Sequence, residues 1–424
     1  MRDLAIIAFL IILMAAALEA GLFILIKKLK RDFQWLITAE DEMPIFPSDL
    51  LKRFFDKSFD PELGWVTKEN TQVQERGGTV GEQSGVYKKS TYNISDQGCR
   101  RNPGYENRPA IISTYGDSFV FSRQVEDNET WQHFLSRLSD SNVLNFGVGN
   151  YGFDQALLRL KREYEKNPTP VVIIGVVPET IVRILSVWKH YSEYGNILAF
   201  KPRFEIYNGG LNIVRNVIDS KDKFDGLREY LSHLQKQDYF YENKFRRDIL
   251  RFPYLFSIMR SCRRNVPLIM SLMLRNILAA MGIEDAGRNR PWEMVLERNF
   301  TIARNLYSTS CAVELFLKLL EDFAIWGREK GFHPVFLLMP YLHDLVYIKE
   351  QECYYAKFVT QARQILHTID LTAPLLTMNS LNTIYAHDFY GGHLSKAGNE
   401  FIARIIADRL SEYIADFKLK AGHA

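Results

Sequence analysis

The chain has 424 residues, of which 47% are hydrophobic, 24% charged and 13% aromatic, a composition that excludes disordered, collagen-like and disulfide-framework proteins. Its 53 basic and 50 acidic residues give a formal net charge of +3, whereas a nucleic-acid-binding protein usually carries a larger and more clustered basic excess. The four cysteines are far apart, with no pair at metal-ligand spacing. We therefore expect no metal site and no nucleic-acid partner.

The first predicted element is an apolar helix over residues 5–26, in which Glu19 is the only charged residue. About 20 apolar residues cross a bilayer as a helix, so we predict an N-terminal transmembrane anchor within residues 1–32. Cleavage of a signal peptide near Ala15–Ala17 is the alternative, but the apolar stretch continues past that point. Basic residues follow the helix at Lys27, Lys28, Lys30 and Arg31. By the positive-inside rule this flank favours a cytoplasmic location for the rest of the chain.

A polar, turn-rich lead-in over residues 33–107 comes next, and we interpret it as irregular or β-containing. Strand-then-helix alternation then begins, and it predicts an α/β domain in two parts, 108–187 and 312–424. The expected strands are 111–115, 142–146, 171–177, 333–339 and 365–371, and the expected helices are 128–139, one from 154, 312–329 and 397–414. The run 171–177 is entirely apolar, as expected for a strand buried on both faces of a parallel sheet.

A long helical insertion, residues 188–311, separates the two parts of the α/β domain. Its apolar run 266–281 is short for a membrane crossing and is interrupted by an arginine. Arg260, Arg263 and Arg264 beside this run are compatible with a helix that lies on a membrane surface. A helical cap packed on its own domain explains the same pattern, and the sequence leaves both interpretations open.

Two segments contain the residues that could carry chemistry. Gly116-Asp117-Ser118 directly follows the first predicted strand, and His393 and Asp388 lie just before the last predicted helix. A serine hydroxyl becomes a nucleophile when a base takes its proton, and a third group must orient that base. We therefore predict Ser118 as nucleophile, His393 as base and Asp388 as orienting carboxylate. Either segment alone would equally suit a helix cap, but both follow strands of one parallel sheet, where ligands bind.

Together with the turn Asn145–Gly152, these motifs resemble the SGNH/GDSL hydrolase superfamily over about residues 108–185 and 331–415. The resemblance implies a doubly wound parallel sheet in a flavodoxin-like three-layer domain, and hydrolysis or transfer of acyl groups without a cofactor. It also implies an oxyanion hole that includes the N–H groups of Ser118 and Asn150, with Gly149 as the alternative. Asparagine at a glycine position is a mild departure, because it tolerates left-handed backbone geometry. Membrane-anchored relatives include alginate O-acetyltransferase-like proteins that modify cell-surface polysaccharide.

Two other positions depart from the pattern of the superfamily. Glu179 stands where an oxyanion-hole asparagine is expected, and an ionised carboxylate cannot donate a hydrogen bond. Losing one such donor typically costs about 10²–10³ in rate. Glu179 could donate when protonated, contact substrate together with Arg183 and Asp117, or simply pair with Arg183 one helical turn later. In addition, Asp388 precedes His393 by five residues, where three are usual.

The sequence thus predicts a membrane-anchored serine esterase acting on an O-acyl group of an envelope glycan or lipid. One alternative is an O-acyltransferase of cell-surface polysaccharide, working with envelope polysaccharide machinery. Another is a non-catalytic glycan-binding or scaffold member of a membrane assembly. The resemblance favours a periplasmic or extracytoplasmic domain and the basic flank favours a cytoplasmic one, so the side of the membrane stays open.

Overall fold

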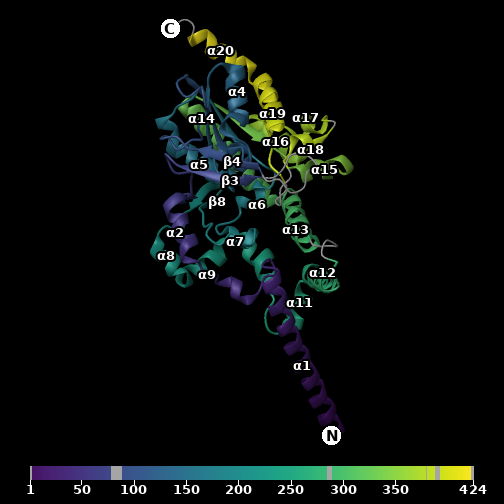
Figure 1. The fold of residues 1–424 in the computed structure, drawn as a ribbon. Helices are drawn as coiled ribbons and strands as arrows, with labels where there is room; N and C mark the ends of the chain where they lie inside the picture. The colour runs from purple at the N-terminus through teal and green to yellow at the C-terminus, as the bar shows by residue number, and fades with distance from the viewer. Residues whose placement is uncertain (1, 78–87, 284–288, 379, 387–391, 422–424) are drawn as a thin grey trace. The chain divides into compact units, whose positions relative to one another are not determined.

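The computed structural model describes residues 2–77, 88–283, 289–378, 380–386 and 392–421 (Figure 1). The chain forms two compact units. We call the first the helical unit; it contains residues 1–51, 186–200 and 222–302. We call the second the sheet unit; it contains residues 52–185, 201–221 and 303–424.

A five-stranded parallel sheet forms the centre of the sheet unit. Its strands are β5 (Ala110–Gly116), β6 (Asn142–Gly147), β7 (Val171–Val176), β10 (His333–Leu338) and β11 (His367–Asp370). Their order across the sheet is β11-β10-β7-β5-β6, and every pairing is parallel. This is the doubly wound order 2-1-3-4-5, in which the strand order reverses between the first and third strands. The predicted parallel α/β sheet is therefore confirmed.

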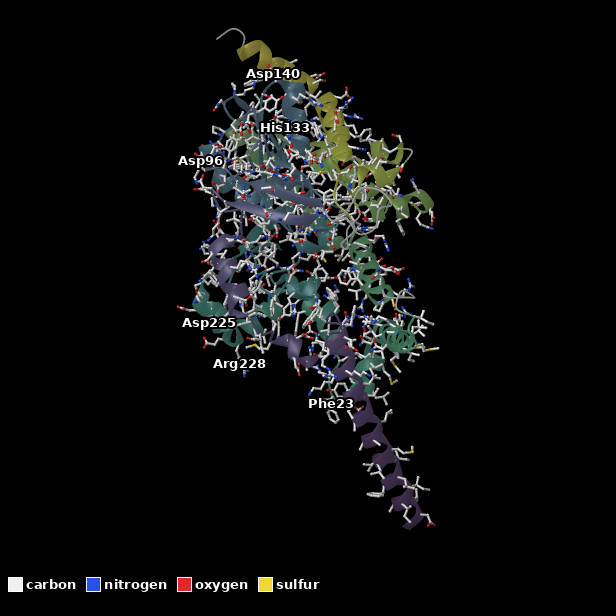
Figure 2. All side chains as sticks on the ribbon, viewed as in Figure 1. Phe23, Asp96, His133, Asp140, Asp225 and Arg228 are labelled. Atoms are coloured by element: carbon white, nitrogen blue, oxygen red, sulfur yellow. The ribbon has the colours of Figure 1, made fainter. Side chains whose placement is uncertain are left out.

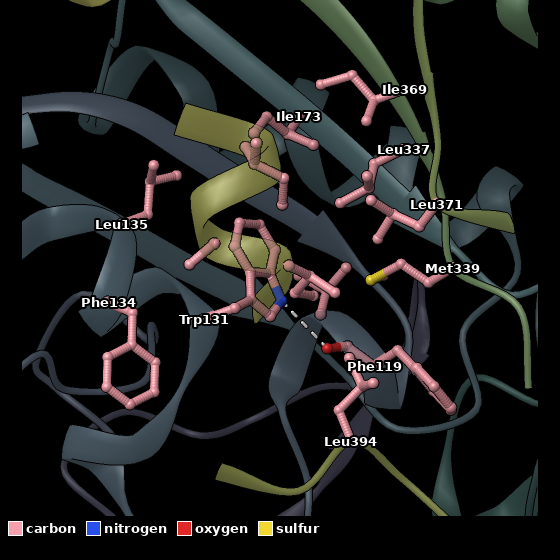
Figure 3. Packing of buried hydrophobic residues seen from close by; sticks show 14 of the residues in the cluster. Phe119, Trp131, Phe134, Leu135, Ile173, Leu337, Met339, Ile369, Leu371 and Leu394 are labelled. Carbon is pink, nitrogen blue, oxygen red and sulfur yellow. Dashed lines mark hydrogen bonds between the residues drawn. The ribbon is translucent and has the colours of Figure 1, made fainter. Parts of the chain in front are cut away.

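Helices cover both faces of this sheet. On one face, α4 (Trp131–Ser139) and α19 (Lys396–Arg409) pack with the strands, and Trp131 lies among Ile173, Leu337 and Leu394 in Figure 3. On the other face lie α5 (Phe153–Glu163), α14 (Ser310–Lys330) and α16 (Ala356–Ile365). There the ring of Phe316 lies 5.5 Å from that of Phe153 and 4.5 Å from that of Phe358. The two apolar faces of the sheet account for the three layers.

Smaller elements complete the sheet unit. Antiparallel pairs β1 (Phe59–Asp60) with β2 (Gly64–Trp65), and β3 (Gln72–Gly77) with β4 (Lys88–Asn93), supply the β content expected of the lead-in. The predicted helix 397–414 is two helices, because α19 ends at Arg409 and α20 (Ser411–Ala421) follows. The predicted helix 128–139 begins only at Trp131, because the Thr130 side chain accepts the His133 N–H as a cap.

The helical unit is built around the C-terminal part of α1 (Arg2–Asp32). Ile26, Leu29 and Phe33 are buried together with Leu268 and Leu272 of α12 (Cys262–Ala280). The other main helices of this unit are α9 (Leu227–Gln237) and α11 (Tyr254–Arg260), and most of α13 (Arg290–Leu306) also belongs to it. Within the part of the chain that the structure describes, α1 is the one helix long and apolar enough to cross a membrane.

The expected boundaries of the lead-in and of the insertion differ from the observed units. Residues 33–51 join the helical unit, where the Leu250 N–H donates to the Ile37 carbonyl at 2.9 Å. Residues 201–221 and 303–311 of the expected 188–311 insertion belong to the sheet unit. The insertion is also not wholly helical, because β8 (Arg203–Tyr207) and β9 (Gly210–Val214) form an antiparallel hairpin. An Arg203 hydrogen bond to the Leu185 carbonyl connects this hairpin to the sheet unit.

Candidate active site

Ser118 and His393 meet where the strand order of the sheet reverses. Ser118 is the first residue of α3 (Ser118–Phe121), which follows β5 directly. Its Oγ lies 2.9 Å from Nε2 of His393, and the two residues are only 5% and 7% exposed. At that separation a serine O–H can donate to an imidazole nitrogen. The structure thus brings together two predicted residues that are 275 positions apart.

A glycine makes the sharp turn before Ser118 possible. Gly116 has φ +152°, and any side chain there would collide with the Gly175 carbonyl of the neighbouring β7 and with Val120. Only a residue without Cβ permits this close approach of β5, α3 and β7. The turn therefore fixes where the Ser118 hydroxyl emerges above the sheet.

The backbone on both sides of His393 is fixed by hydrogen bonds. The carbonyl oxygen of His393 accepts the Ala386 N–H at 2.8 Å, and the N–H of His393 donates to Oε1 of Gln124 at 3.3 Å. The imidazole ring of His393 lies 5.1 Å from the ring of Phe119. Asp388, the predicted orienting carboxylate, lies outside the described residues, so its role stays a prediction.

Asp117 is fully buried, and its carboxylate accepts hydrogen bonds from groups of the protein itself. One carboxylate oxygen accepts the Phe119 N–H at 2.8 Å and caps α3, while the other accepts the Val177 N–H at 2.9 Å. Arg183 Nη1 lies 3.3 Å from the second oxygen. The second oxygen therefore connects the loop after β5 with the loop after β7, and contact of Asp117 with substrate stays a prediction.

Arg183 is the buried residue that connects the strand-end loops. Its guanidinium donates to Oδ2 of Asp117, to the Tyr151 carbonyl at 3.1 Å, to Oε2 of Glu179 at 3.0 Å and to the Tyr341 hydroxyl at 3.1 Å. These partners follow β5, β6, β7 and β10, respectively. A planar guanidinium with five donors suits such a junction. The structure thus contains the expected pairing of Glu179 with Arg183, and contact of these two residues with substrate stays a prediction.

One oxygen of the Glu179 carboxylate faces two hydrogen-bond donors. Its Oε2 accepts from Arg183 and also from the Tyr341 hydroxyl at 3.3 Å. A carboxylate that accepts two such hydrogen bonds is arranged as an acceptor. Sequence reasoning found the Glu179–Arg183 spacing but missed Tyr341, for which the sequence contains no local signal.

The turn after β6 contains Gly149 and Asn150, whose backbone N–H groups are the predicted partners of Ser118 in the oxyanion hole. Asn150 has φ +68°, the left-handed geometry that asparagine tolerates. Trp65 Nε1 donates to the Gly149 carbonyl at 2.9 Å, and the Tyr151 hydroxyl donates to the Trp65 carbonyl. In a trans peptide the C=O and the next N–H point in opposite directions. Trp65 thereby sets the direction of the Asn150 N–H, a role that nothing in the lead-in sequence indicated.

A buried ion pair supports this turn from within. Lys201 Nζ lies 2.5 Å from Oδ2 of Asp154, at the start of α5, and 3.0 Å from the Arg183 carbonyl. Burial raises the pKa of the Asp154 carboxyl, and the Lys201 charge opposes that shift. Among the described residues, no group of three or more His, Cys, Asp or Glu side chains could hold a metal ion.

Comparisons with known proteins add little to this geometry. No family model and no curated protein matches the chain. Among solved structures, the chain is similar to a protein from Desulfitobacterium hafniense DCB-2 described as lipolytic and of the G-D-S-L family. The identity is 12% and the TM-score 0.28, over 70% of this chain and 99% of that chain. At this level of similarity we infer neither fold nor activity from it.

Proposed function

We propose that the sheet unit is a serine acyl hydrolase of the SGNH/GDSL type. The observation that carries the proposal is the 2.9 Å approach of Ser118 Oγ to His393 Nε2 at the reversal point of a doubly wound sheet. In such sheets ligands bind outside the carboxyl ends of the strands, where both residues lie.

In the proposed mechanism, Ser118 Oγ attacks the carbonyl carbon of an ester while His393 Nε2 takes its proton. The oxyanion of the tetrahedral intermediate accepts hydrogen bonds from the N–H groups of Ser118 and Asn150, or of Gly149. His393 then protonates the departing alcohol. Water, deprotonated by His393, releases the acid from the acyl-enzyme. Asp388 is the proposed orienting group for the imidazole.

The proposed site operates without a side-chain oxyanion donor at position 179. Glu179 accepts hydrogen bonds from Arg183 and Tyr341, so the hole consists of backbone donors. One missing donor typically costs about 10²–10³ in rate. We therefore expect slow turnover of unactivated esters and measurable turnover of activated aryl esters.

We further propose that α1 anchors the chain in a membrane and that the substrate is an O-acylated glycan or lipid of the envelope. The length and apolar composition of α1 support the anchor. Transfer of the acyl group to a sugar hydroxyl instead of water is the second candidate activity, since both reactions pass through the same acyl-enzyme.

Hydrolysis of p-nitrophenyl acetate by the full chain in detergent tests the activity. Ser118→Ala and His393→Gln should each lower kcat by about 10⁴-fold or more, as expected for residues that act as one unit. Ser113→Ala, on the same strand, and His133→Gln, on α4, are the matched controls and should retain activity. Unchanged turnover in Ser118→Ala would overturn the proposal. Adding an oligosaccharide acceptor and measuring acetylated sugar against free acetate separates transfer from hydrolysis.

A further inference from the structure

Two helices of the helical unit expose many large apolar side chains. The exposed apolar residues of α12 and of its C-cap recur at helical spacing: Val266, Met270, Met273, Leu274, Ile277 and Met281. Phe252, Leu255, Phe256 and Met259 are exposed on α11 and just before it. Phe256 is 67% and Met270 64% exposed. Apolar surface of this kind marks contact with a partner or a membrane.

The opposite side of the same helices packs on α1. Leu268, Ile269 and Leu272 of α12 are buried with Ile26 and Leu29 of α1. Figure 1 shows α11 beside α1, and the ring of Phe23, labelled in Figure 2, lies 6.1 Å from that of Tyr254. The exposed apolar side chains therefore belong to helices that pack directly on the apolar helix that we propose as the anchor.

Glu19 sets the depth of α11 along α1. Its carboxylate accepts the N–H groups of Tyr254 at 2.5 Å and of Leu255 at 2.9 Å, the first two residues of α11. These N–H groups have no partner inside their own helix, and the helix N-terminus attracts a negative charge. The single charge of the apolar segment is thus satisfied by α11.

The position of Glu19 places this contact inside the apolar length of α1. Glu19 precedes Ile26, the end of the apolar run, by seven residues, which is about 10 Å at roughly 1.5 Å per residue. Interfacial helices bury their apolar face by about 5–10 Å at the boundary between headgroups and acyl chains. The start of α11 thus lies at the depth of such a helix when α1 crosses the bilayer.

Exposed cations accompany the apolar surface. Lys27, Lys28 and Arg31 of α1 are exposed, as are Arg260 and Arg263 at the junction of α11 and α12. Basic residues beside an apolar helical face are typical of helices that bind anionic lipid surfaces.

We infer that α11 and α12 form a lipid-contacting platform, with their exposed apolar side chains inserted into the leaflet that surrounds the C-terminal part of α1. This inference rests on the proposed anchoring by α1 and is independent of the proposed esterase activity. It selects the membrane-surface interpretation of the segment over the helical cap.

Site-specific fluorescence quenching of the full chain tests the platform. Cys262, Cys311 and Cys353 are replaced by serine, which leaves only the buried Cys99, and one further cysteine is introduced by Met270→Cys or Ile277→Cys. Leu10→Cys on α1 reports on the anchor, and Arg228→Cys, exposed on α9 and labelled in Figure 2, reports on solvent. Each variant is labelled with bimane and reconstituted in nanodiscs of phosphatidylcholine and phosphatidylglycerol. Lipids spin-labelled high on the acyl chain, or iodide in the buffer, then quench the label.

The platform predicts that labels at Met270→Cys and Ile277→Cys are quenched by the lipids and shielded from iodide, like Leu10→Cys, whereas Arg228→Cys is quenched by iodide. Iodide quenching at Met270→Cys with lipid quenching at Leu10→Cys would overturn the platform and leave the anchor intact. Shielding of Met270→Cys from both quenchers would assign the surface to a protein partner or a second copy, which also overturns the platform. Absence of lipid quenching at Leu10→Cys would overturn both.

Discussion

The two units depart in opposite ways from the usual arrangement of apolar residues inside and charged residues outside. The sheet unit buries charges, and the helical unit exposes apolar side chains. In the sheet unit, Asp117, Asp154, Arg183 and Lys201 are almost completely removed from solvent. In the helical unit, large apolar side chains such as Phe256 and Met270 face outward. Both kinds of departure carry more information than an ordinary buried leucine.

The two departures have different physical explanations. Each buried charge of the sheet unit has several partners inside the protein, so the charges offset their desolvation cost by fixing the strand-end loops. The exposed apolar residues lie on the side of α11 and α12 that faces away from α1, so their stabilisation must come from an apolar phase outside the unit. We therefore propose that the sheet unit carries the chemistry of this chain and that the helical unit contacts lipid.

Arg183→Met tests the role of the buried charges in the sheet unit, and we expect it to have the largest effect on stability. Removing the guanidinium leaves Asp117 and Glu179 without their cation, and breaking a buried pair in this way typically costs about 3–5 kcal/mol. The free energy of unfolding by denaturant measures this cost. Arg404→Met is the matched control, because Arg404 and Glu400 form an i,i+4 pair like Arg183 and Glu179 but on the exposed surface. It should change stability by about 0.5 kcal/mol or less, and equal costs in both variants would contradict the account.

A pH-dependent loss of stability should occur in the helical unit. Burial lowers the pKa of His190 to about 4, and its Nε2 lies 2.9 Å from the Asp41 carbonyl oxygen. The pKa of His190 is lower in the folded protein than in the unfolded chain, so the unfolded chain binds the proton first as the pH falls. The free energy of unfolding is therefore highest above pH 6.5. It decreases by roughly 3 kcal/mol as the pH falls from about 6.5 to about 4. Hydrogen exchange of residues 186–200 at several pH values measures it.

Substitution of His190 isolates this contribution. His190→Phe should abolish most of the extra opening at low pH, because phenylalanine can pack on Trp188 and does not titrate. His233→Gln, at an exposed position of α9, should behave like the unsubstituted protein. A steep acid-dependent opening that persists in His190→Phe would assign the effect to another group.

Glu179→Ala distinguishes a structural carboxylate from an oxyanion donor. With Glu179 as an acceptor for Arg183 and Tyr341, the substitution should lower stability by about 1–3 kcal/mol and change kcat by less than tenfold. A loss of 10²–10³ in kcat at unchanged stability is what an oxyanion donor would give, and it would contradict our assignment.

Trp65→Phe is expected to have the smallest effect on stability and a selective effect on turnover. The ring can still pack against Tyr151, but the Nε1 donor to the Gly149 carbonyl is lost, at a cost of about 1 kcal/mol. If this hydrogen bond directs the Asn150 N–H, kcat should fall about tenfold while KM is unchanged. A change in KM alone would argue against a positioning role.

Local patterns predicted much of the sheet unit but not the contacts that complete its site. The apolar β-branched run 171–177, the Gly116-Asp117-Ser118 turn and the histidine before the last helix indicated the parallel sheet and the Ser118–His393 pair. Trp65 was missed because its bond to Gly149 joins residues 84 positions apart, through a segment without regular periodicity. The unit boundaries were missed because a β-hairpin within the expected insertion belongs to the sheet unit.

The Glu179–Arg183 pair illustrates the same limit at a single position. Its i,i+4 spacing was visible in the sequence, whereas the convergence of Asp117 and Tyr341 on the same guanidinium depends on the order of the strands. Spacing identified the pair, and only the fold identified it as a buried junction.

Covalent labelling of the full chain with a fluorophosphonate probe tests the central claim, an activated serine, most directly. The account predicts that the intact protein gains one phosphonyl group, that peptide mapping places it on Ser118, and that Ser118→Ala and His393→Ala both abolish labelling. Labelling that persists in Ser118→Ala, or a folded chain that does not react while His393 is intact, would contradict it.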